Sequence, residues 1–378
     1  MNNPPLALYA HFPWCVQKCP YCDFNSYTLK EQLPEERYID TLRRDFDAQA
    51  AMVEGRPLTS IFLGGGTPSL FSPAAIERLL AHARASLGFV EPIEVTLEAN
   101  PGTIERGRFS EYRAAGISRV SLGAQSFDER QLKLLGRIHS ADETRRAAEE
   151  LHAAGLTNFN LDLMYALPEQ TPGEAESDLQ AALALGPAHI SQYHLTIEPG
   201  TVFAAAPPVQ PADELVEDML QRSLQVLEAA GFEQYEVSGY ARPGARCAHN
   251  LNYWTFGDYL GIGAGAHGKI SDTARGIIVR TQQTREPRRY LAAEPAALAR
   301  KTIAVQELPF EFAMNGFRLV EGFPDEMFES RTGLPVSVLE RALAEVQARG
   351  LVARGPGTWR ATAQGFRFLN DILVELLA

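Results

Sequence analysis

The sequence up to about residue 240 is dominated by short apolar runs that alternate with longer segments of helical periodicity. Six runs have the length of a strand, and they cover residues 6–10, 60–63, 93–97, 119–122, 158–161 and 190–196. The clearest helical segments between them are residues 36–51, 73–85, 141–154 and 173–185. Strands that alternate with helices are typical of repeated βα units, so the sequence predicts an α/β fold around a parallel sheet.

Polar or glycine-rich residues follow most of these runs. Residues 64–68 read GGGTP after the second run, and residues 98–102 read EANPG after the third. Because the carboxyl ends of the strands in a βα barrel face the same side, we expect these segments to converge on one site.

Three cysteines stand shortly after the first run. Cys15, Cys19 and Cys22 form a C-x3-C-x2-C pattern, whereas the fourth cysteine, Cys247, is distant in the sequence. Three thiolates on one loop can hold a [4Fe-4S] cluster and leave one iron without a protein ligand. S-adenosylmethionine (SAM) can chelate that iron through its amino and carboxylate groups. The alternative is a zinc site completed by His11 or Asp23, although structural zinc usually draws two ligand pairs from separate segments.

This cysteine spacing after a first strand, with Phe24 close behind, resembles the radical SAM superfamily. The resemblance implies a partial (β/α)6 barrel, a [4Fe-4S] cluster on the three cysteines, and bound SAM. It assigns SAM contacts to the glycine motif and to strand ends, namely Tyr9, Gly65, Gly66, Thr67, Glu98, Gln125, Arg137 and Asp162. For the polar residues in this set, the alternative is a solvated rim of the barrel.

Longer sequence segments restrict the resemblance to one family within this superfamily. The segments are CPYCDFNS at 19–26, EANPG at 98–102, LGRIH at 135–139, NLDLM at 160–164 and HNLNYW at 249–254. Together they resemble the HemW family of heme chaperones, which is related to the HemN coproporphyrinogen III oxidases. The resemblance implies a protein that binds heme and a SAM-ligated cluster and delivers heme to respiratory-chain hemoproteins.

The alternative function is oxygen-independent coproporphyrinogen III dehydrogenation, as in HemN. HemN has a further cysteine where this chain has Phe24, and a long N-terminal arm where only 14 residues precede Cys15. Both differences favour the chaperone.

A heme site needs an axial ligand, apolar walls and cations near the propionates. The resemblance implies heme contact through His249, with Cys247 as a second candidate ligand. The candidate walls are Tyr253, Trp254 and Phe256, and the candidate cations are Arg275, Arg280, Arg285, Arg288 and Arg289. The alternatives are that His249 packs a loop onto the barrel and that the arginines are solvated.

The formal net charge of −12 opposes broad contact with nucleic acid, which needs clustered Lys and Arg. We find no signal peptide and no apolar stretch of spanning length, and therefore expect a cytoplasmic protein. The resemblance implies heme, heme-receiving respiratory proteins and an electron donor for the cluster as partners. It leaves a peripheral membrane contact and a homodimer open.

Three regions are expected. Residues 1–240 form the radical SAM (β/α)6 core. Residues 241–300 form a bridging region with the HNLNYW motif, rich in glycine and aromatic residues and without a clear helical period up to residue 284. Residues 301–378 form a HemN-type C-terminal helical domain that resembles a winged helix, with a hairpin near 351–360 before a last helix. This last region is more acidic than basic, which disfavours a role in reading DNA.

Overall fold

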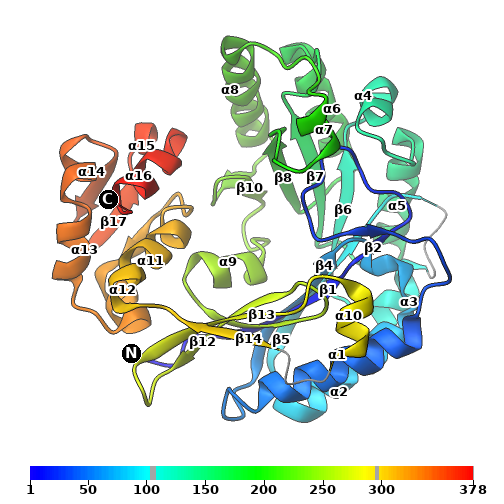
Figure 1. Ribbon diagram of the computed structural model, residues 1–378. Helices are drawn as coiled ribbons and strands as arrows, with labels where there is room; N and C mark the ends of the chain where they lie inside the picture. Colours follow the sequence, from blue (N-terminus) through cyan, green and yellow to red (C-terminus); the bar gives the residue numbers. More distant parts are fainter. Residues whose placement is uncertain (103–107, 294–297, 378) are drawn as a thin grey trace.

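The computed structural model describes residues 1–102, 108–293 and 298–377, and its main feature is one mixed sheet (Figure 1). Within these residues the sheet has 12 strands in the order β14-β13-β12-β11-β1-β4-β5-β6-β7-β8-β10-β9. The central parallel strands are β1 (Leu6–Phe12), β4 (Leu58–Gly65), β5 (Phe89–Ala99), β6 (Arg119–Gln125), β7 (Phe159–Tyr165) and β8 (His189–His194). They confirm the predicted α/β fold and its six parallel strands.

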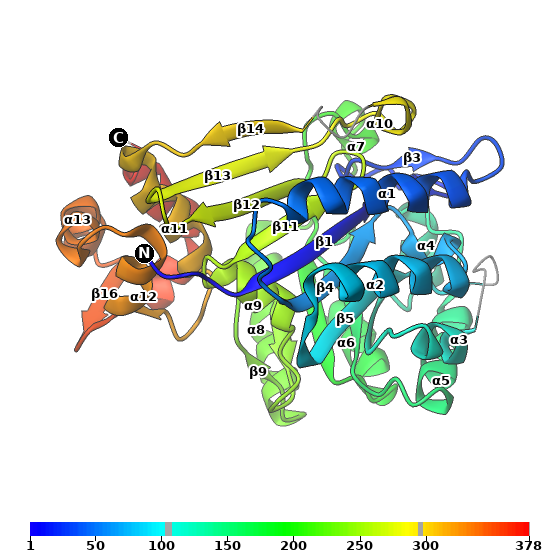
Figure 2. The ribbon, with the colours of Figure 1, turned by 90° about the horizontal axis from the view of Figure 1, so that it is seen from below.

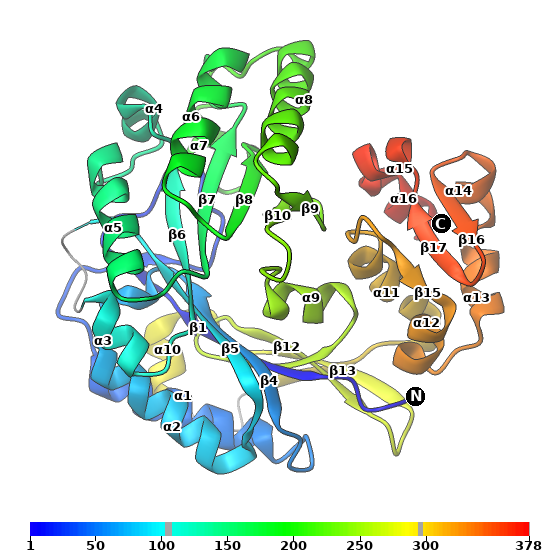
Figure 3. The ribbon, with the colours of Figure 1, turned by 180° about the vertical axis from the view of Figure 1, so that it is seen from behind.

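Helices cover the outer face of these strands, as Figures 2 and 3 show. They are α1 (Glu35–Ala50), α2 (Pro73–Leu87), α3 (Phe109–Ala114), α4 (Glu129–Leu134), α5 (Ala141–Ala153), α6 (Pro172–Ala184) and α8 (Asp213–Ala229). Three of these helices are capped at their N-termini by hydroxyl side chains. Ser72, Ser140 and Thr171 each accept a hydrogen bond from a backbone N–H of the first turn. The main apolar core lies between these helices and the sheet.

Further strands extend the sheet at both ends. Beside β8 lie the antiparallel strands β10 (Gly239–Ala241) and β9 (Glu233–Gln234). Beside β1 lie β11 (Asp258–Ile262), β12 (His267–Asp272), β13 (Ile277–Gln282) and β14 (Ala299–Thr302). Since β9 and β14 do not pair with each other, the barrel is partial.

The region after residue 241 is more regular than its composition indicates. Residues 248–254 form a helix, α9 (Ala248–Trp254), although we expected no helical segment there. Seven residues span about two turns, which is too short for a periodic pattern to be recognised. A second short helix, α10 (Pro287–Ala292), packs against α1.

The C-terminal part has a core of its own, centred on buried aromatic residues such as Phe312, Phe328 and Trp359. Its helical segments are η3 (Val305–Glu307), α11 (Leu308–Gly316), α12 (Asp325–Thr332), α13 (Val336–Ala342), α14 (Ala344–Ala348), α15 (Ala363–Arg367) and α16 (Leu369–Glu375). A small sheet of β15 (Phe323–Pro324), β17 (Thr358–Ala361) and β16 (Val352–Gly355) completes it. The hairpin and the last helix are confirmed.

Figure 3 shows this C-terminal part beside α9 and the end of the sheet that carries β9 and β10. Arg318 Nη2 lies 3.1 Å from Glu236 Oε2, and the N–H of Val320 donates to the carbonyl of Tyr235 at 3.1 Å. In the described part of the chain, no helix is both long enough and apolar enough to cross a bilayer.

Candidate functional site

The loop with the three cysteines leaves the sheet at the carboxyl end of β1 and folds back on itself. Two short strands, β2 (Trp14–Cys15) and β3 (Tyr27–Thr28), pair in parallel and bring the ends of the loop together. Inside the loop, the N–H of Cys22 donates to the carbonyl of Cys19 at 3.2 Å. These backbone contacts hold all three cysteines at the rim of the barrel.

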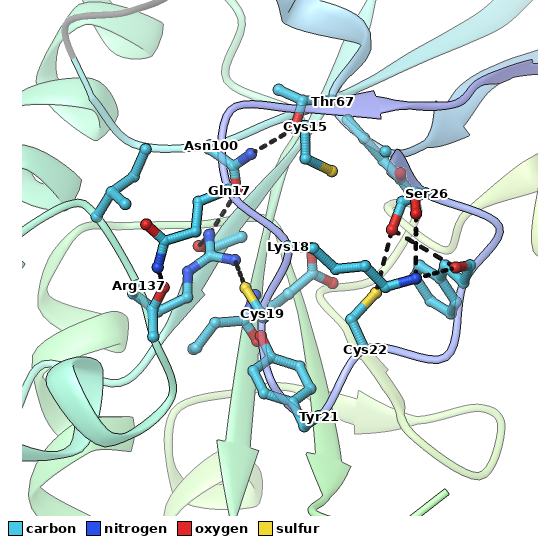
Figure 4. A pocket seen from close by; sticks show the side chains of 18 of the residues that line it. Cys15, Gln17, Lys18, Cys19, Tyr21, Cys22, Ser26, Thr67, Asn100 and Arg137 are labelled. Atoms are coloured by element: carbon cyan, nitrogen blue, oxygen red, sulfur yellow. Dashed lines mark hydrogen bonds between the residues drawn. The ribbon is translucent and has the colours of Figure 1, made fainter. Parts of the chain in front are cut away.

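The three cysteine side chains line one cavity of about 420 Å³ (Figure 4). Cys15, Cys19 and Cys22 are free and partly exposed. Arg137 Nη1 donates to Cys19 Sγ at 3.4 Å, and Cys22 Sγ lies 3.7 Å from Ser26 Oγ. The Arg137 guanidinium places a positive charge beside the sulfur of Cys19. The donor set therefore fits a cluster held by three thiolates.

A zinc site completed by His11 or Asp23 fits the structure poorly. Both ring nitrogens of His11 are engaged, since Nε2 donates to the carbonyl of Asn25 at 3.0 Å and Nδ1 accepts from the Tyr9 hydroxyl at 3.0 Å. Asp23 is exposed. Over the residues that the structure describes, no three His, Cys, Asp or Glu side chains gather closely enough to bind a single metal ion.

The glycine motif lies against the cysteine loop, and this contact requires bare backbone. Gly65 has a φ of +112°, and a Cβ there would overlap the imidazole of His11. The N–H of Gly66 donates to the carbonyl of Phe12 at 2.7 Å, and a Cβ on Gly66 would lie 2.6 Å from the carbonyl oxygen of Trp14. Only glycine permits both close approaches.

Two partly buried carboxylates face the same cavity. Glu98 Oε2 accepts the N–H of Gly65 at 2.9 Å, while burial and the neighbouring Asp162 raise the pKa of Glu98 to about 7. Burial also raises the pKa of Asp162, although this carboxylate accepts hydrogen bonds from Ser121 and Asn160. A cationic ligand in the cavity would favour the charged form of both groups.

Arg137 is held by the protein on several sides. Its Nη2 donates to Asn100 Oδ1 and, at 2.9 Å, to the carbonyl of Gly123. Asn100 Nδ2 in turn donates to Thr67 Oγ1 at 2.9 Å. We did not predict Asn100 as a site residue, although it lies within the polar segment at 98–102. This side chain connects the glycine motif to the arginine beside Cys19.

The ends of β6 and β8 complete the wall. Gln125 lines the cavity and has a φ of +67°, a conformation that is uncommon outside glycine and often marks a functional position. Tyr193 and His194 also line the cavity. We did not predict Tyr193 as a site residue. Strand alternation could have found it, because Tyr193 is two residues beyond Ser191, the sheet partner of Asp162.

Tyr9 is absent from the cavity wall within the described residues. Its hydroxyl donates to His11, and its ring lies 6.3 Å from Phe62 and 6.5 Å from His249, measured between ring centroids. The structure therefore places Tyr9 behind the glycine motif, where it supports His11.

His249 is buried in α9, away from the cavity, with 1% of its surface exposed. Its Nδ1 lies 3.2 Å from Ser60 Oγ, and its Nε2 lies 2.9 Å from the Tyr253 hydroxyl. Burial lowers the pKa of His249 to about 3, so the ring stays neutral. Neither ring nitrogen is free to bind heme iron in this arrangement, which favours the packing role.

Cys247, at the start of α9, is fully buried. Its Sγ lies 3.5 Å from Glu94 Oε1, and the same carboxylate accepts the N–H groups of Ala248 and His249, each at 3.1 Å. Burial raises the pKa of the Cys247 thiol to about 12. A thiol of that kind is a poor iron ligand.

The five arginines proposed for heme propionates are dispersed. Arg280 bonds to the Tyr259 hydroxyl at 2.8 Å and pairs with Glu311. Arg275 lies at the turn between β12 and β13, whereas Arg285, Arg288 and Arg289 lie on or just before α10. The structure does not assemble them around His249.

Comparisons with known proteins agree with this site. The family model of the radical SAM superfamily matches residues 9–182, and the model of the HemN C-terminal domain matches residues 303–368. The solved structure of HemN, a radical SAM coproporphyrinogen III oxidase from Escherichia coli, has a TM-score of 0.82 at 24% identity. That match covers 99% of this chain and 90% of HemN. The fold and the three-cysteine pocket thus define a radical SAM protein.

Within this class, the similarity to heme chaperones is high and spans the whole chain. Heme chaperone HemW of Escherichia coli (strain K12) is 48% identical over 375 residues, with 99% of both chains covered. Heme chaperone HemW of Haemophilus influenzae is 47% identical over 374 residues, with 98% of this chain and 97% of that protein covered. The chain belongs to the HemW family.

Proposed function

We propose that this protein is a heme chaperone, which binds heme and a SAM-ligated [4Fe-4S] cluster and delivers heme to respiratory-chain hemoproteins. The identity of 48% with a heme chaperone over 99% of both chains carries the proposal. A cavity lined by Cys15, Cys19 and Cys22 supports it. The partners are heme, the receiving hemoproteins and an electron donor. We propose a cytoplasmic location, because free thiols suit a reducing compartment.

In this proposal Cys15, Cys19 and Cys22 would hold the [4Fe-4S] cluster. A cluster held in this way would supply an open iron for SAM and the electron for its reductive cleavage. Arg137 holds the side chain of Cys19 through its hydrogen bond to Sγ. The bare backbone of Gly65 and Gly66 lets the ligand approach the strand ends.

Polar side chains around the cavity orient SAM. The cavity wall contains Thr67, Glu98, Gln125, Arg137 and Asp162. We propose that Glu98 and Asp162 attract the positive charge of the ligand, while Gln125 supplies a neutral hydrogen-bonding group. Tyr9 acts indirectly, because its hydroxyl fixes His11 under the glycine motif.

We propose that His249 has a structural role and packs α9 against the barrel. Iron ligation by its imidazole would require a nitrogen to exchange its hydrogen bond to Ser60 or Tyr253 for the metal. It would also require the buried ring to reach solvent.

The alternative function is oxidative decarboxylation of coproporphyrinogen. The likeness to HemN at 24% identity concerns the fold. Phe24 stands where HemN has a further cysteine, and its side chain is 59% exposed at the rim of the cavity. This position supports the chaperone over the decarboxylase.

The test is heme transfer under anaerobic conditions. Wild-type protein with its cluster is loaded with heme and mixed with a heme-free respiratory hemoprotein, and the Soret band of the acceptor is followed. We expect transfer by the wild type. Ser variants of Cys15, Cys19 or Cys22 should lose the iron chromophore, SAM binding and normal transfer.

Cys247→Ser is the matched control, because this thiol is buried beside Glu94 and outside the cavity. It should keep the iron and the transfer. The proposal fails if the wild type transfers no heme, or if one of the three loop cysteines is dispensable for iron.

A further inference from the structure

Beneath the cavity, toward the amino ends of the strands, β6, β7 and β8 carry buried polar side chains where a barrel interior is ordinarily apolar. Figure 3 shows these three strands side by side. Asp162 lines the cavity, and Asn160, two residues earlier on β7, lies on the same face of the sheet. Asn160 and its neighbour across the sheet, His189 on β8, are each 1% exposed. Polar groups buried to this extent need hydrogen-bond partners within the protein.

The hydrogen bonds around Asn160 have one consistent direction. An ionised Asp162 can only accept, so Asn160 turns its Nδ2 toward Asp162 and its Oδ1 toward His189. His189 Nδ1 therefore carries the proton and donates to Asn160 Oδ1 at 2.7 Å. The neutral ring then accepts at Nε2 from the Tyr235 hydroxyl, 2.9 Å away. Burial lowers the pKa of His189 well below its usual value, so the ring stays neutral.

Asn160 in turn connects to both oxygens of Asp162. Its Nδ2 donates to Asp162 Oδ1 at 2.8 Å and to Ser121 Oγ at 2.7 Å. Ser121 donates to Asp162 Oδ2 at 3.0 Å. The Ser191 hydroxyl donates to Asn160 Oδ1 at 3.1 Å and supports the same orientation of the amide. The carboxylate is thus held at two points, and its direction in the cavity depends on how the Asn160 amide is turned.

A buried positive charge lies near these groups. Arg119, the first residue of β6, is 2% exposed. Burial raises the pKa of Asp162, while its hydrogen bonds from Ser121 and Asn160 and the charge of Arg119 act in the opposite direction. After burial, the charge of Arg119 is the second cause that lowers the pKa of His189. The hydrogen bonds and Arg119 therefore favour an ionised carboxylate beside a neutral imidazole.

We propose that His189 and Asn160 are positioning residues for SAM: His189 fixes the amide of Asn160, and Asn160 holds the carboxylate of Asp162 in the orientation that contacts the ligand. The proposal rests on the proposed function, in which Asp162 attracts the positive charge of SAM. Among the described residues that line the cavity, neither His189 nor Asn160 is present. Both therefore act on the ligand through Asp162.

The experiment compares two variants of His189 that have nearly the same size. Asn places an amide nitrogen at the position of Nδ1 and retains the donor, whereas Leu has a similar branched shape without it. Anaerobic calorimetry on cluster-loaded protein measures the affinity for SAM. We expect His189→Leu to weaken SAM binding by about tenfold, and His189→Asn to stay within about twofold of the wild type. Both variants lose the contact with Tyr235, so the donor alone distinguishes them.

Gln192→Leu is the matched control. Gln192 lies on the same strand, is 6% exposed and donates to Ser223 on α8 at 2.9 Å. Its variant should lower the free energy of unfolding in urea much as His189→Leu does, and leave SAM affinity unchanged. The proposal is overturned if His189→Leu and His189→Asn bind SAM equally, or if Gln192→Leu weakens binding as much as His189→Leu.

Ser191→Ala replaces the His189 variants if they do not yield folded protein. It removes only the second donor to Asn160 Oδ1 and leaves His189 in place. We expect SAM binding to weaken by about twofold to threefold, because one of two donors to the same oxygen is lost. Unchanged affinity in Ser191→Ala would then overturn the proposal.

Asp162→Asn separates this proposal from the proposed function. Asp162→Asn should weaken SAM binding, and adding His189→Leu should cause no further loss, because the effect of His189 passes through the carboxylate. Normal SAM affinity in Asp162→Asn would contradict the ligand contact in the proposed function, and this proposal with it. Weakened binding in Asp162→Asn with a full additional loss from His189→Leu would leave that contact intact and overturn the positioning role.

Discussion

His11 joins the two loops that form the site. Its Nε2–H donates to the carbonyl of Asn25, which fixes the neutral tautomer and makes Nδ1 the acceptor for the Tyr9 hydroxyl. The same ring occupies the space where a side chain on Gly65 would lie. One imidazole thus sets the distance between the cysteine loop and the glycine motif.

Gly65→Ala should therefore disturb both loops. The new methyl group overlaps the His11 ring, and the φ of +112° is unfavourable for alanine. We expect lower SAM affinity, measured by anaerobic calorimetry, together with lower iron content. Gly55→Ala is the control, since Gly55 also has a positive φ, +73°, but nothing lies within 4 Å of its Cβ position. It should cost about 1 kcal/mol and leave SAM binding intact. Equal SAM affinity in folded Gly65→Ala would contradict this account.

Glu98 should make SAM binding depend on pH. Its pKa is about 7, raised by burial and by Asp162, and the positive charge of SAM favours the ionised carboxylate. Below pH 7 the carboxyl group must first release its proton, so affinity should fall by about tenfold per pH unit. Glu98→Gln should remove this dependence, whereas the surface control Glu77→Gln should retain it. A pH profile that is the same in Glu98→Gln and wild type would refute the role of this carboxylate.

At the scale of elements, α9 is anchored to the barrel by buried polar contacts. Glu94, on β5, accepts two N–H groups at the start of the helix, and Ser60, on β4, bonds to His249. A carboxylate at a helix N-terminus satisfies N–H groups that have no partner within the helix. The HNLNYW motif is thereby tied to two neighbouring strands of the core.

His249→Ala should lower the free energy of unfolding by about 1 to 3 kcal/mol and leave the cluster in place. The Soret spectrum of bound heme should not change, because both ring nitrogens serve packing. The low pKa of His249, about 3, also makes stability depend on pH. Below pH 6.5 the imidazole takes up a proton in the unfolded chain but stays neutral in the folded protein. As the pH falls from 6.5 to 3, the free energy of unfolding of the wild type therefore decreases by up to about 1.4 kcal/mol per pH unit. The variant should not show this decrease.

His152→Ala, at an exposed histidine on the outer helix α5, is the control for denaturation and spectra. It should show a smaller loss of stability. A shifted Soret band in His249→Ala, with unchanged stability, would restore the axial-ligand hypothesis.

Much of the fold could be predicted from the sequence because the parallel strands are buried and apolar, and the C-x3-C-x2-C spacing indicates its chemistry directly. The cavity also contains most of the residues predicted from the family resemblance, with Tyr9 and His249 outside it. The location of Tyr9 and His249 outside the cavity could not be derived from the sequence. Whether a histidine points into a cavity or into the core depends on partners distant in the sequence, such as Ser60 for His249. The same holds for Asn100, whose partners are Thr67 and Arg137.

At the scale of the whole molecule, one buried carboxylate joins the first strands to the extension of the sheet. Asp258, on β11, accepts hydrogen bonds from Lys269 Nζ at 2.8 Å and from Arg56 Nη1 at 2.8 Å. It also accepts the N–H and hydroxyl of Ser271. Arg56 precedes β4, whereas the other two partners lie on β12. Asp258 therefore holds the partial barrel and its extension together.

Asp258→Asn should lower the free energy of unfolding by about 3 to 5 kcal/mol, because it leaves the buried Lys269 without its counter-charge. Urea denaturation followed by circular dichroism measures the change. Asp272→Asn is the control, since its pair with Arg275 is exposed, and it should cost at most about 1 kcal/mol. Similar losses in the two variants would show that Asp258 has no special role.

The function of the whole molecule is tested most directly by one preparation examined for two activities. Anaerobically purified protein with its cluster is incubated with SAM and a reductant, and both heme retention and the decarboxylation of coproporphyrinogen III are measured. The account predicts stable heme binding and no decarboxylated product. Sustained conversion of coproporphyrinogen without heme retention would contradict it, and would make the protein a decarboxylase despite Phe24.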